Sequence, residues 1–169
     1  MTRRLVLIVL TLIAIGLAAP AAATGVDFNL TGGIDIAGSF DLGLHSTDSD
    51  PGFTLGLEAM FQVPVVEAGV GLEYGFARGT DIQDVDVSYT HLYGIARLFV
   101  FGRIYLVGRL GYYNLSVSHL HEGNLDSDLA LGAGIGAGLL RNLKVELIFN
   151  NLAGDFDYET WAARAVFTF

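Results

Sequence analysis

The chain has 169 residues, no cysteine and a formal net charge of −9, with 18 acidic side chains against 9 basic ones. This length fits one domain, the absence of cysteine excludes disulfides and thiolate metal sites, and the acidic balance argues against nucleic-acid binding, because phosphate contacts need Lys and Arg. The composition is nevertheless 52% hydrophobic. Beyond the N-terminus no apolar run reaches the roughly 20 residues of a transmembrane helix. A soluble all-β domain and a membrane β-barrel remain as the two options.

The N-terminal segment has the layout of a secretory signal peptide. Arg3 and Arg4 form a basic start, residues 5–17 are almost all apolar, and residues 18–23 are small residues of the Ala-x-Ala kind. The apolar run is short for a membrane span. We therefore expect cleavage after Ala23, which leaves residues 24–169 as the mature domain. An uncleaved N-terminal anchor is the alternative.

Eight segments of the mature chain alternate with a period of two, as half-buried strands do. They cover residues 26–40, 53–63, 66–77, 87–101, 104–115, 129–139, 144–150 and 160–169. One face of each segment is apolar and free of charge, whereas the other face carries nearly all the strand charges. Two details are less regular. Ser39 is assigned to the charged face of the first segment, and Phe99 and Phe101 fall on the charged face of theirs, which suggests a bulge or an error of register.

The uncharged faces distinguish a membrane barrel from a soluble one. A soluble barrel, such as one that carries a lipid in the periplasm, turns its charges outward to water. In a membrane barrel, an Arg or Lys that faces hydrocarbon at the midplane costs about 2–4 kcal/mol. Eight uncharged faces are what contact with lipid requires. The charged faces are therefore expected to line the interior.

The connections support the same fold. Short ones at residues 63–65, 102–103 and 141–142 alternate with long ones at 43–52, 79–86, 118–128 and 151–158. Outer-membrane barrels have short periplasmic turns and longer outer loops. The sequence predicts an all-β fold, an eight-stranded antiparallel up-and-down transmembrane β-barrel in the bacterial outer membrane.

Two segments carry a family resemblance. The chain ends in Ala165-Val166-Phe167-Thr168-Phe169, and the glycine-rich residues 132–138 are followed by a tight turn and Lys144-Val145-Glu146-Leu147. Both features resemble the small eight-stranded outer-membrane barrels typified by the OmpA transmembrane domain and OmpX. The resemblance implies that Phe167 and Phe169 belong to a terminal signal read by the outer-membrane assembly machinery.

Charges of both signs share the predicted inner faces. They are Asp35, Glu58, Glu67, Glu73 and Glu146, together with Arg97, Arg109, Lys144 and Arg164. The interior of an eight-stranded barrel is just wide enough for side chains to fill, and unpaired buried charges are costly. We expect a lumen closed by a network of ion pairs. A gated proton or ion path and a catalytic carboxylate pair are the alternatives.

The sequence offers little for metal or catalytic chemistry. His119 and His121 would point the same way on an extended chain and suit a transition metal, and the acidic loops would suit divalent cations that bridge lipopolysaccharide phosphates. Solvated loop polarity explains both features as well. Some barrels of this size act on lipid A as a deacylase or palmitoyl transferase, but no Ser, His and acid spacing here matches a triad.

The functional prediction is accordingly a non-enzymatic barrel without cofactor or metal, with a structural or surface-interaction role in the cell envelope. Its expected partners are outer-membrane lipid, lipopolysaccharide and the assembly machinery, and it is expected to be a monomer. A narrow pore-forming channel and a lipid A-modifying enzyme are the alternative functions.

Overall fold

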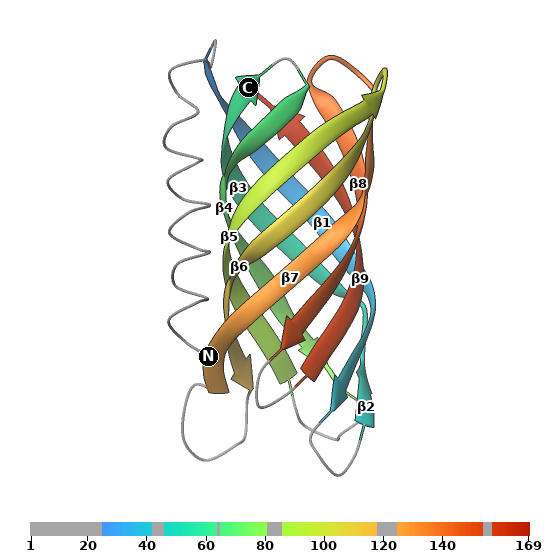
Figure 1. Cartoon of the computed structure of the whole chain (residues 1–169). Coiled ribbons are helices and arrows are strands. Elements are labelled where there is room, and N and C mark those ends of the chain that lie inside the picture. Colours follow the sequence, from blue (N-terminus) through green and yellow to red (C-terminus); the bar gives the residue numbers. More distant parts are fainter. Residues whose placement is uncertain (1–24, 42–45, 64, 81–85, 118–124, 154–156) are drawn as a thin grey trace.

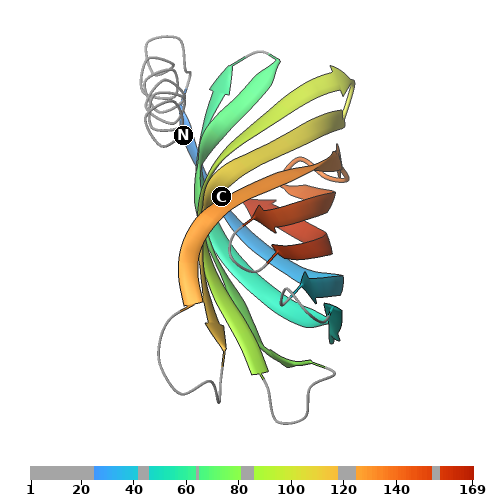
Figure 2. The same ribbon diagram turned by 60° about the horizontal axis from the view of Figure 1, so that its bottom comes forward.

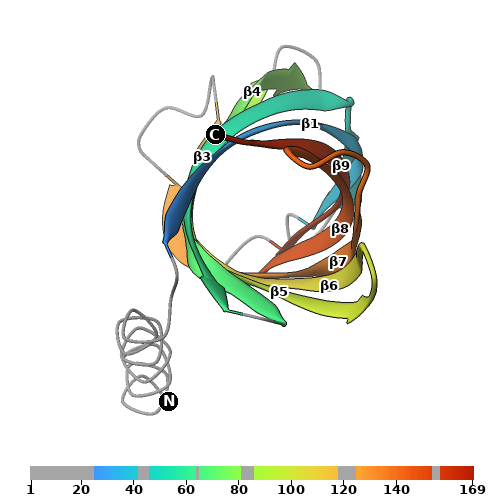
Figure 3. The same ribbon diagram turned by 90° about the horizontal axis from the view of Figure 1, so that it is seen from above.

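A computed structural model of the chain describes residues 25–41, 46–63, 65–80, 86–117, 125–153 and 157–169, so the predicted signal peptide lies outside the described residues. The strands are β1 (Val26–Asp41), β2 (Ser46–Ser49), β3 (Gly52–Val63), β4 (Val66–Gly79), β5 (Asp86–Phe101), β6 (Ile104–Val117), β7 (Leu125–Gly138), β8 (Leu143–Ala153) and β9 (Asp157–Thr168). Strands β2 and β3 both pair antiparallel with β1, and from β3 to β9 each strand pairs antiparallel with the next. β1 also pairs with β9, which closes the barrel (Figures 1 and 3). Among the described residues, no helix has the length and apolar character needed to cross a membrane.

The short strand β2 continues β3 in space. Both pair with β1 in the same register, so the ladder resumes after a break at residues 50 and 51. Pro51 has no backbone N–H to offer the ladder, and the Asp50 N–H donates to the Gly79 carbonyl of β4 at 3.0 Å. The wall therefore has eight strands when β2 and β3 are counted as one, and the predicted barrel is confirmed. Residues 46–49, expected in a loop, instead lengthen the wall.

Exposure alternates along the strands as the sequence predicts. In β3, Leu57 is 60% exposed and the adjacent Glu58 is 2% exposed. In β4, Leu72 and Glu73 repeat this contrast, with 52% and 1% exposed. Apolar side chains therefore cover the outside of the barrel and charged side chains fill its inside, the reverse of a soluble barrel.

The ladder has irregular steps at four places, namely between Asp35 and Ala37, Gly75 and Arg78, Phe99 and Phe101, and Tyr113 and Leu115. The first three shift the alternation of inner and outer faces in β1, β4 and β5. An extra residue in one strand moves the following side chains to the opposite face. The step in β5 explains its irregular pattern: Phe99 stays partly buried, whereas Phe101 is 79% exposed. The step in β1 turns Ser39 to the outer surface, so its assignment to the inner face was wrong.

The two ends of the barrel differ. The turns β3–β4, β5–β6 and β7–β8 lie at the same end as the C-terminus, and β2 lies at the opposite end (Figure 1). The β5–β6 turn uses Gly102 at φ 57°, a left-handed conformation that favours glycine. We call these the short-turn end and the β2 end. Between them, the strands are inclined to the barrel axis, as closure of an eight-stranded sheet requires (Figure 2).

Candidate functional site: the charged lumen

The structure places all of the predicted lumen charges inside the barrel and gives each an ion-pair partner. They are Asp35, Glu58, Glu67, Glu73, Arg97, Arg109, Lys144, Glu146 and Arg164. Eight of them are buried, and Lys144, near the short-turn end, is partly exposed. These residues come from seven strands, namely β1, β3, β4, β5, β6, β8 and β9. Most of their ion pairs cross the lumen and join strands that are not neighbours in the wall.

Arg97 is the most deeply buried member of this network. Its side chain has 0% exposure. Its Nη2 lies 2.8 Å from Glu58 Oε2 and its Nε lies 2.6 Å from Glu146 Oε1. Its Nη1 lies 3.7 Å from Glu67 Oε2, a longer approach that carries charge attraction rather than a hydrogen bond. One guanidinium therefore joins carboxylates from three strands across the lumen.

Arg109 shares two of these carboxylates with Arg97. Its Nη2 lies 3.3 Å from Glu58 Oε1 and 3.2 Å from Glu146 Oε2, and its Nη1 lies 3.4 Å from Glu73 Oε2. Glu73 also accepts a 2.6 Å hydrogen bond from Arg164 Nη2. The guanidinium group of Arg109 stacks over the Tyr93 ring at 4.6 Å, where a cation is attracted to the ring face.

The ends of the network are closed by separate pairs. Toward the short turns, Lys144 Nζ lies 2.6 Å from Glu67 Oε2. Toward the β2 end, Arg78 Nη1 lies 2.6 Å from Asp35 Oδ2, and Arg78 Nη2 donates to the Tyr158 hydroxyl at 2.5 Å. Arg78 was not among the predicted residues, because the regular alternation of β4 would have turned it outward.

Tyrosine hydroxyls connect these pairs into one network. Tyr89 donates to Asp35 Oδ2 at 2.9 Å and lies 3.2 Å from Glu73 Oε1, which links the β2 end to the middle of the lumen. The Tyr93 hydroxyl donates to Glu58 Oε1 at 3.2 Å, and the Tyr105 hydroxyl donates to Glu146 Oε1 at 3.1 Å. A continuous chain of contacts therefore runs from Arg78 at one end to Lys144 at the other. Buried networks of this kind gain rigidity when their members are satisfied.

Glycines make room for the tyrosine rings. A Cβ added at Gly71 would lie 2.5 Å from Tyr93 Cζ, and one added at Gly136 would overlap the Tyr105 ring. Both glycines face the lumen on a strand that borders the tyrosine's own strand. The glycine-rich stretch of β7 thus accommodates ring volume on its inner face.

Part of the lumen wall is apolar, which the charge pattern alone did not indicate. One cluster toward the β2 end contains Val87, Tyr89, Tyr113, Leu115, Ala130 and Tyr158, and a second contains Met60, Tyr93, Ile95, Tyr105, Val107 and Ile148. Tyr89, Tyr93 and Tyr105 belong to both environments, with rings among apolar side chains and hydroxyls on carboxylates. Their alternation on β5 and β6 at inner parity was the available sequence signal.

The lumen network is balanced in charge although the chain is not. Five carboxylates, Asp35, Glu58, Glu67, Glu73 and Glu146, face five cationic groups, Arg78, Arg97, Arg109, Lys144 and Arg164. The net charge of −9 therefore resides outside this network. Equal numbers of opposite charges in contact satisfy the requirement that buried ions be paired.

The described residues contain no group of three or more His, Cys, Asp or Glu side chains arranged to hold a metal ion. The predicted candidates His119 and His121 lie outside the described residues. His91, which is buried in the lumen, packs its ring against Tyr93 at 4.7 Å between centroids.

At the C-terminus, Phe167 and Phe169 lie on the outer surface at the short-turn end. They are 40% and 71% exposed, and their rings meet edge to face at 5.3 Å. The Phe169 N–H donates to the Phe28 carbonyl at 3.0 Å, which ties the end of the chain to β1. The two residues named as a candidate assembly signal are thus presented on the barrel exterior beside its closing seam.

A closed antiparallel barrel with an apolar exterior and a charged interior defines a transmembrane β-barrel of the outer-membrane type. Residues 7–163 match the outer membrane protein beta-barrel domain family, and the chain belongs to that family. It is a protein of the bacterial outer membrane. A search of curated proteins finds no significant match.

Solved structures share the fold at low sequence identity. Ail, the attachment invasion locus protein of Yersinia pestis, superposes with a TM-score of 0.63 at 18% identity, over 86% of this chain and 99% of Ail. Neisserial surface protein A superposes with a TM-score of 0.60 at 14% identity, over 86% of this chain and 99% of that protein. The N-terminal β-barrel domain of Pseudomonas aeruginosa OprF superposes with a TM-score of 0.53 at 16% identity, over 83% of this chain and 97% of that domain. At these identities the likeness concerns the fold.

Proposed function

We propose that this protein is a non-enzymatic surface barrel whose interior is closed and whose interactions occur at the β2 end, facing away from the cell. The observation that carries the proposal is the position of Arg97, fully buried among Glu58, Glu67 and Glu146. A water-filled passage would expose such groups to solvent. Here they are enclosed by one another and by the tyrosine rings.

The shape of the barrel supports an outward-facing role for the β2 end. The turns at the opposite end are short, as periplasmic turns are in outer-membrane barrels, and the longer connections join the strands at the β2 end. Two structures with the same fold are those of proteins described as a surface protein and as an attachment invasion locus protein. Those descriptions belong to those proteins, and they accord with a surface role here.

Conductance tests the closed interior directly. The mature chain, folded in detergent and inserted into a planar bilayer, is expected to give little or no steady current, because the packed ion pairs occupy the lumen. A shift in gel mobility on boiling verifies folding, and a general porin in the same bilayer verifies that insertion is detectable. Large and steady single-channel currents from the unmutated protein would contradict the proposal and support the pore alternative.

Protease treatment of intact cells tests the orientation. The sequence predicts cleavage within residues 43–52 or 118–128, because exposed connections are favoured sites. Since residues 46–49 belong to β2 and residues 125–128 to β7, cleavage is expected in the parts of these ranges outside the two strands. Cleavage at Arg103 or Arg141 in the short turns would place the opposite end outside. The mass of the purified chain also tests the proposed removal of residues 1–23.

The proposed assembly signal has a matched control. Phe169→Ala is expected to lower the amount of folded protein in the outer membrane while leaving folding in detergent intact. Phe101→Ala removes a ring of similar exposure, 79% against 71%, at the same end of the barrel. Equal losses in the membrane for the two variants would exclude a specific role for Phe169.

A further inference from the structure

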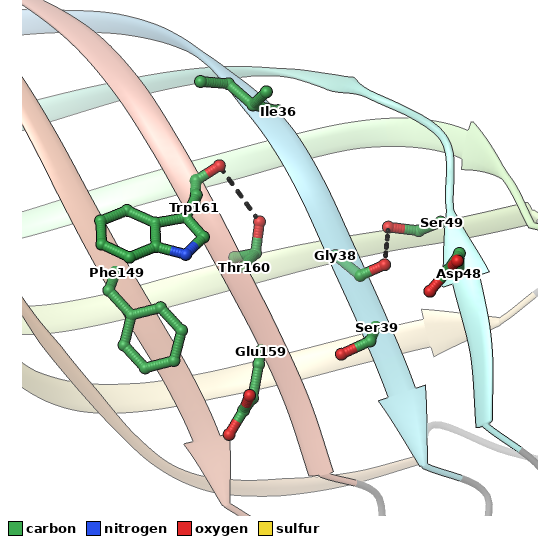
Figure 4. Close-up of a pocket in the computed structure, with 9 residues that line it drawn as sticks. All are labelled: Ile36, Gly38, Ser39, Asp48, Ser49, Phe149, Glu159, Thr160 and Trp161. Carbon is green, nitrogen blue, oxygen red and sulfur yellow. Dashed lines mark hydrogen bonds between the residues drawn. The ribbon is translucent and has the colours of Figure 1, made fainter.

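A hollow lies on the outer wall of the barrel near the β2 end, separate from the lumen. It measures about 470 Å³ and is formed by β1, β2, β8 and β9. Its lining includes Ile36, Ser39, Asp48, Phe149, Glu159 and Trp161 (Figure 4). Its volume falls in the range of about 300–1,000 Å³ that is typical of small-molecule sites.

The fold builds this hollow from an ordered row of polar residues. The irregular step between Asp35 and Ala37 turns Ser39 outward, and β1 then pairs Ser39 with Asp48 of β2 on one side and with Glu159 of β9 on the other. Glu159 is in turn paired with Asn151 of β8, whose Nδ2 donates to Glu159 Oε1 at 3.0 Å. Four polar side chains therefore cross four adjacent strands in line.

An aromatic row borders the polar row on the side toward the middle of the barrel. Trp161 follows Glu159 by two residues on the same face of β9, and it is paired with Phe149 of β8. The two rings lie 5.3 Å apart with their planes at 53°, and Trp161 is 48% exposed. Aromatic girdles mark the interfaces of outer-membrane barrels, so this boundary between aromatic and polar rows lies at the level of lipid head groups.

The polar groups of the hollow limit which class of ligand can bind there. Carboxylates of Asp48 and Glu159 accept hydrogen bonds only, and the Ser39 hydroxyl donates or accepts. Among the residues that the structure describes, the lining holds no Lys or Arg. A ligand that fits must therefore bring several donors to the carboxylates and a compact apolar face to the indole. A phosphate group brings only negative charge, and an acyl chain brings no donors. The hydroxyls and the ring face of a sugar meet both requirements.

From this arrangement we propose that the hollow binds a sugar ring in the head group of a glycolipid in the adjoining membrane leaflet. The ring packs on Trp161 and Phe149, and its hydroxyls donate to Asp48 and Glu159. The site deepens the proposed surface role, because it rests on the β2 end facing the outer leaflet.

The protein supplies its own reporter, because Trp161 is its single tryptophan. The folded mature chain in detergent is titrated with rough-type lipopolysaccharide, with the free oligosaccharide released from it, with Mg²⁺ alone and with phosphatidylethanolamine. A saturable change in Trp161 emission is expected with both saccharide probes, with tighter binding for the lipid-linked form. The change should persist when EDTA is present.

Matched variants locate the site. Asp48→Asn combined with Glu159→Gln is expected to weaken saccharide binding by about tenfold or more, since hydrogen bonds to charged groups are lost. Asp86→Asn removes an exposed carboxylate of β5 that is outside the lining, and it should leave binding unchanged.

Unaltered binding in the double variant would overturn the proposal, as would the absence of a saturable change in Trp161 emission. A response to Mg²⁺ alone, or one abolished by EDTA, would replace the sugar site by a cation site. A response to phosphatidylethanolamine equal to that with saccharide would replace it by an ammonium site.

This test is independent of the proposed function. Binding in detergent does not depend on which end of the barrel faces outward or on whether the lumen conducts. If saccharide binds in detergent but proteases cut intact cells at Arg103 or Arg141, the orientation is wrong and the site stands. If proteases cut the long connections but no saccharide binds, the orientation stands and the site is wrong.

Discussion

Arg78 pairs with Asp35 inside the lumen because β4 is irregular between Gly75 and Arg78. Regular alternation would place Arg78 outward with Phe76. Instead, Phe76 is 46% exposed and Arg78 only 5%. The guanidinium group lies between the rings of Tyr89 and Tyr158, at 5.4 and 5.3 Å from their centroids. A local irregularity of the backbone thus supplies the cation that closes the network near the β2 end.

Replacing Arg78 with Ala is expected to lower the free energy of unfolding in detergent by about 3–5 kcal/mol, because Asp35 is left as an uncompensated buried charge. Arg103→Ala is the control, since this arginine is exposed in the β5–β6 turn and its side chain donates to the Leu139 carbonyl rather than to a carboxylate of the lumen. Urea unfolding followed by circular dichroism measures both. Equal, small effects for the two variants would show that the Arg78 pair is not enclosed.

Arg97 and Arg109 are expected to be energetically coupled, because both contact Glu58 and Glu146. After either single replacement by Met, each carboxylate keeps one arginine. After both replacements, neither carboxylate has a cation from this pair. The double variant should therefore lose more stability than the two single variants together, by about 0.5–3 kcal/mol. A double-mutant cycle of unfolding free energies measures this term, and additive losses would contradict a shared network.

The strands, their faces and the closed barrel follow from period-two alternation, because lipid contact imposes a strict pattern on every strand. The pairing partners inside the lumen do not follow in the same way. Arg97 of β5 meets Glu146 of β8 across the barrel, a contact that depends on strand tilt and relative stagger rather than on spacing along the chain. The charged residues themselves were predictable, since they occupy the inner parity.

Irregular steps account for the wrong face predicted for Ser39 and for the omission of Arg78. Ser39 and Arg78 follow such steps and lie on the face opposite to that of a regular strand. A bulge adds one residue to a strand and leaves no mark in the composition. A prediction that continues the two-residue alternation past the bulge therefore assigns the following residues to the wrong face. In β5 the sequence did indicate the irregular step, because Phe99 and Phe101 are apolar residues at positions of the charged face. The outer hollow was missed for the same reason, because it needs Ser39 on the outside.

Two glycine replacements separate packing inside the lumen from backbone effects. Gly71→Ala is expected to destabilise the barrel by about 1–3 kcal/mol, because the new methyl group would meet the Tyr93 ring in a filled interior. An added Cβ there would lie 2.5 Å from Tyr93 Cζ, whereas nothing lies within 4 Å of one added at Gly108 on the outer surface. Gly108→Ala is expected to be neutral or stabilising by up to about 1 kcal/mol. Unfolding midpoints in detergent compare the two, and a greater loss at Gly108 would argue against a packed lumen.

The membrane-facing surface is tested by placing one charge at two depths. Leu57 lies in the middle of β3, paired with Leu30 and Leu72, and is 60% exposed on the outer wall. Leu140 has a similar exposure, 61%, but lies in the β7–β8 turn at the end of the barrel. Leu57→Arg is expected to cost about 2–4 kcal/mol of folding free energy in a lipid bilayer, and Leu140→Arg about 0–1 kcal/mol, because the cost of a charge falls from the midplane to the interface. Reversible unfolding from phospholipid vesicles measures both values. If both replacements have equal and small effects in vesicles, the outer face of β3 does not contact hydrocarbon.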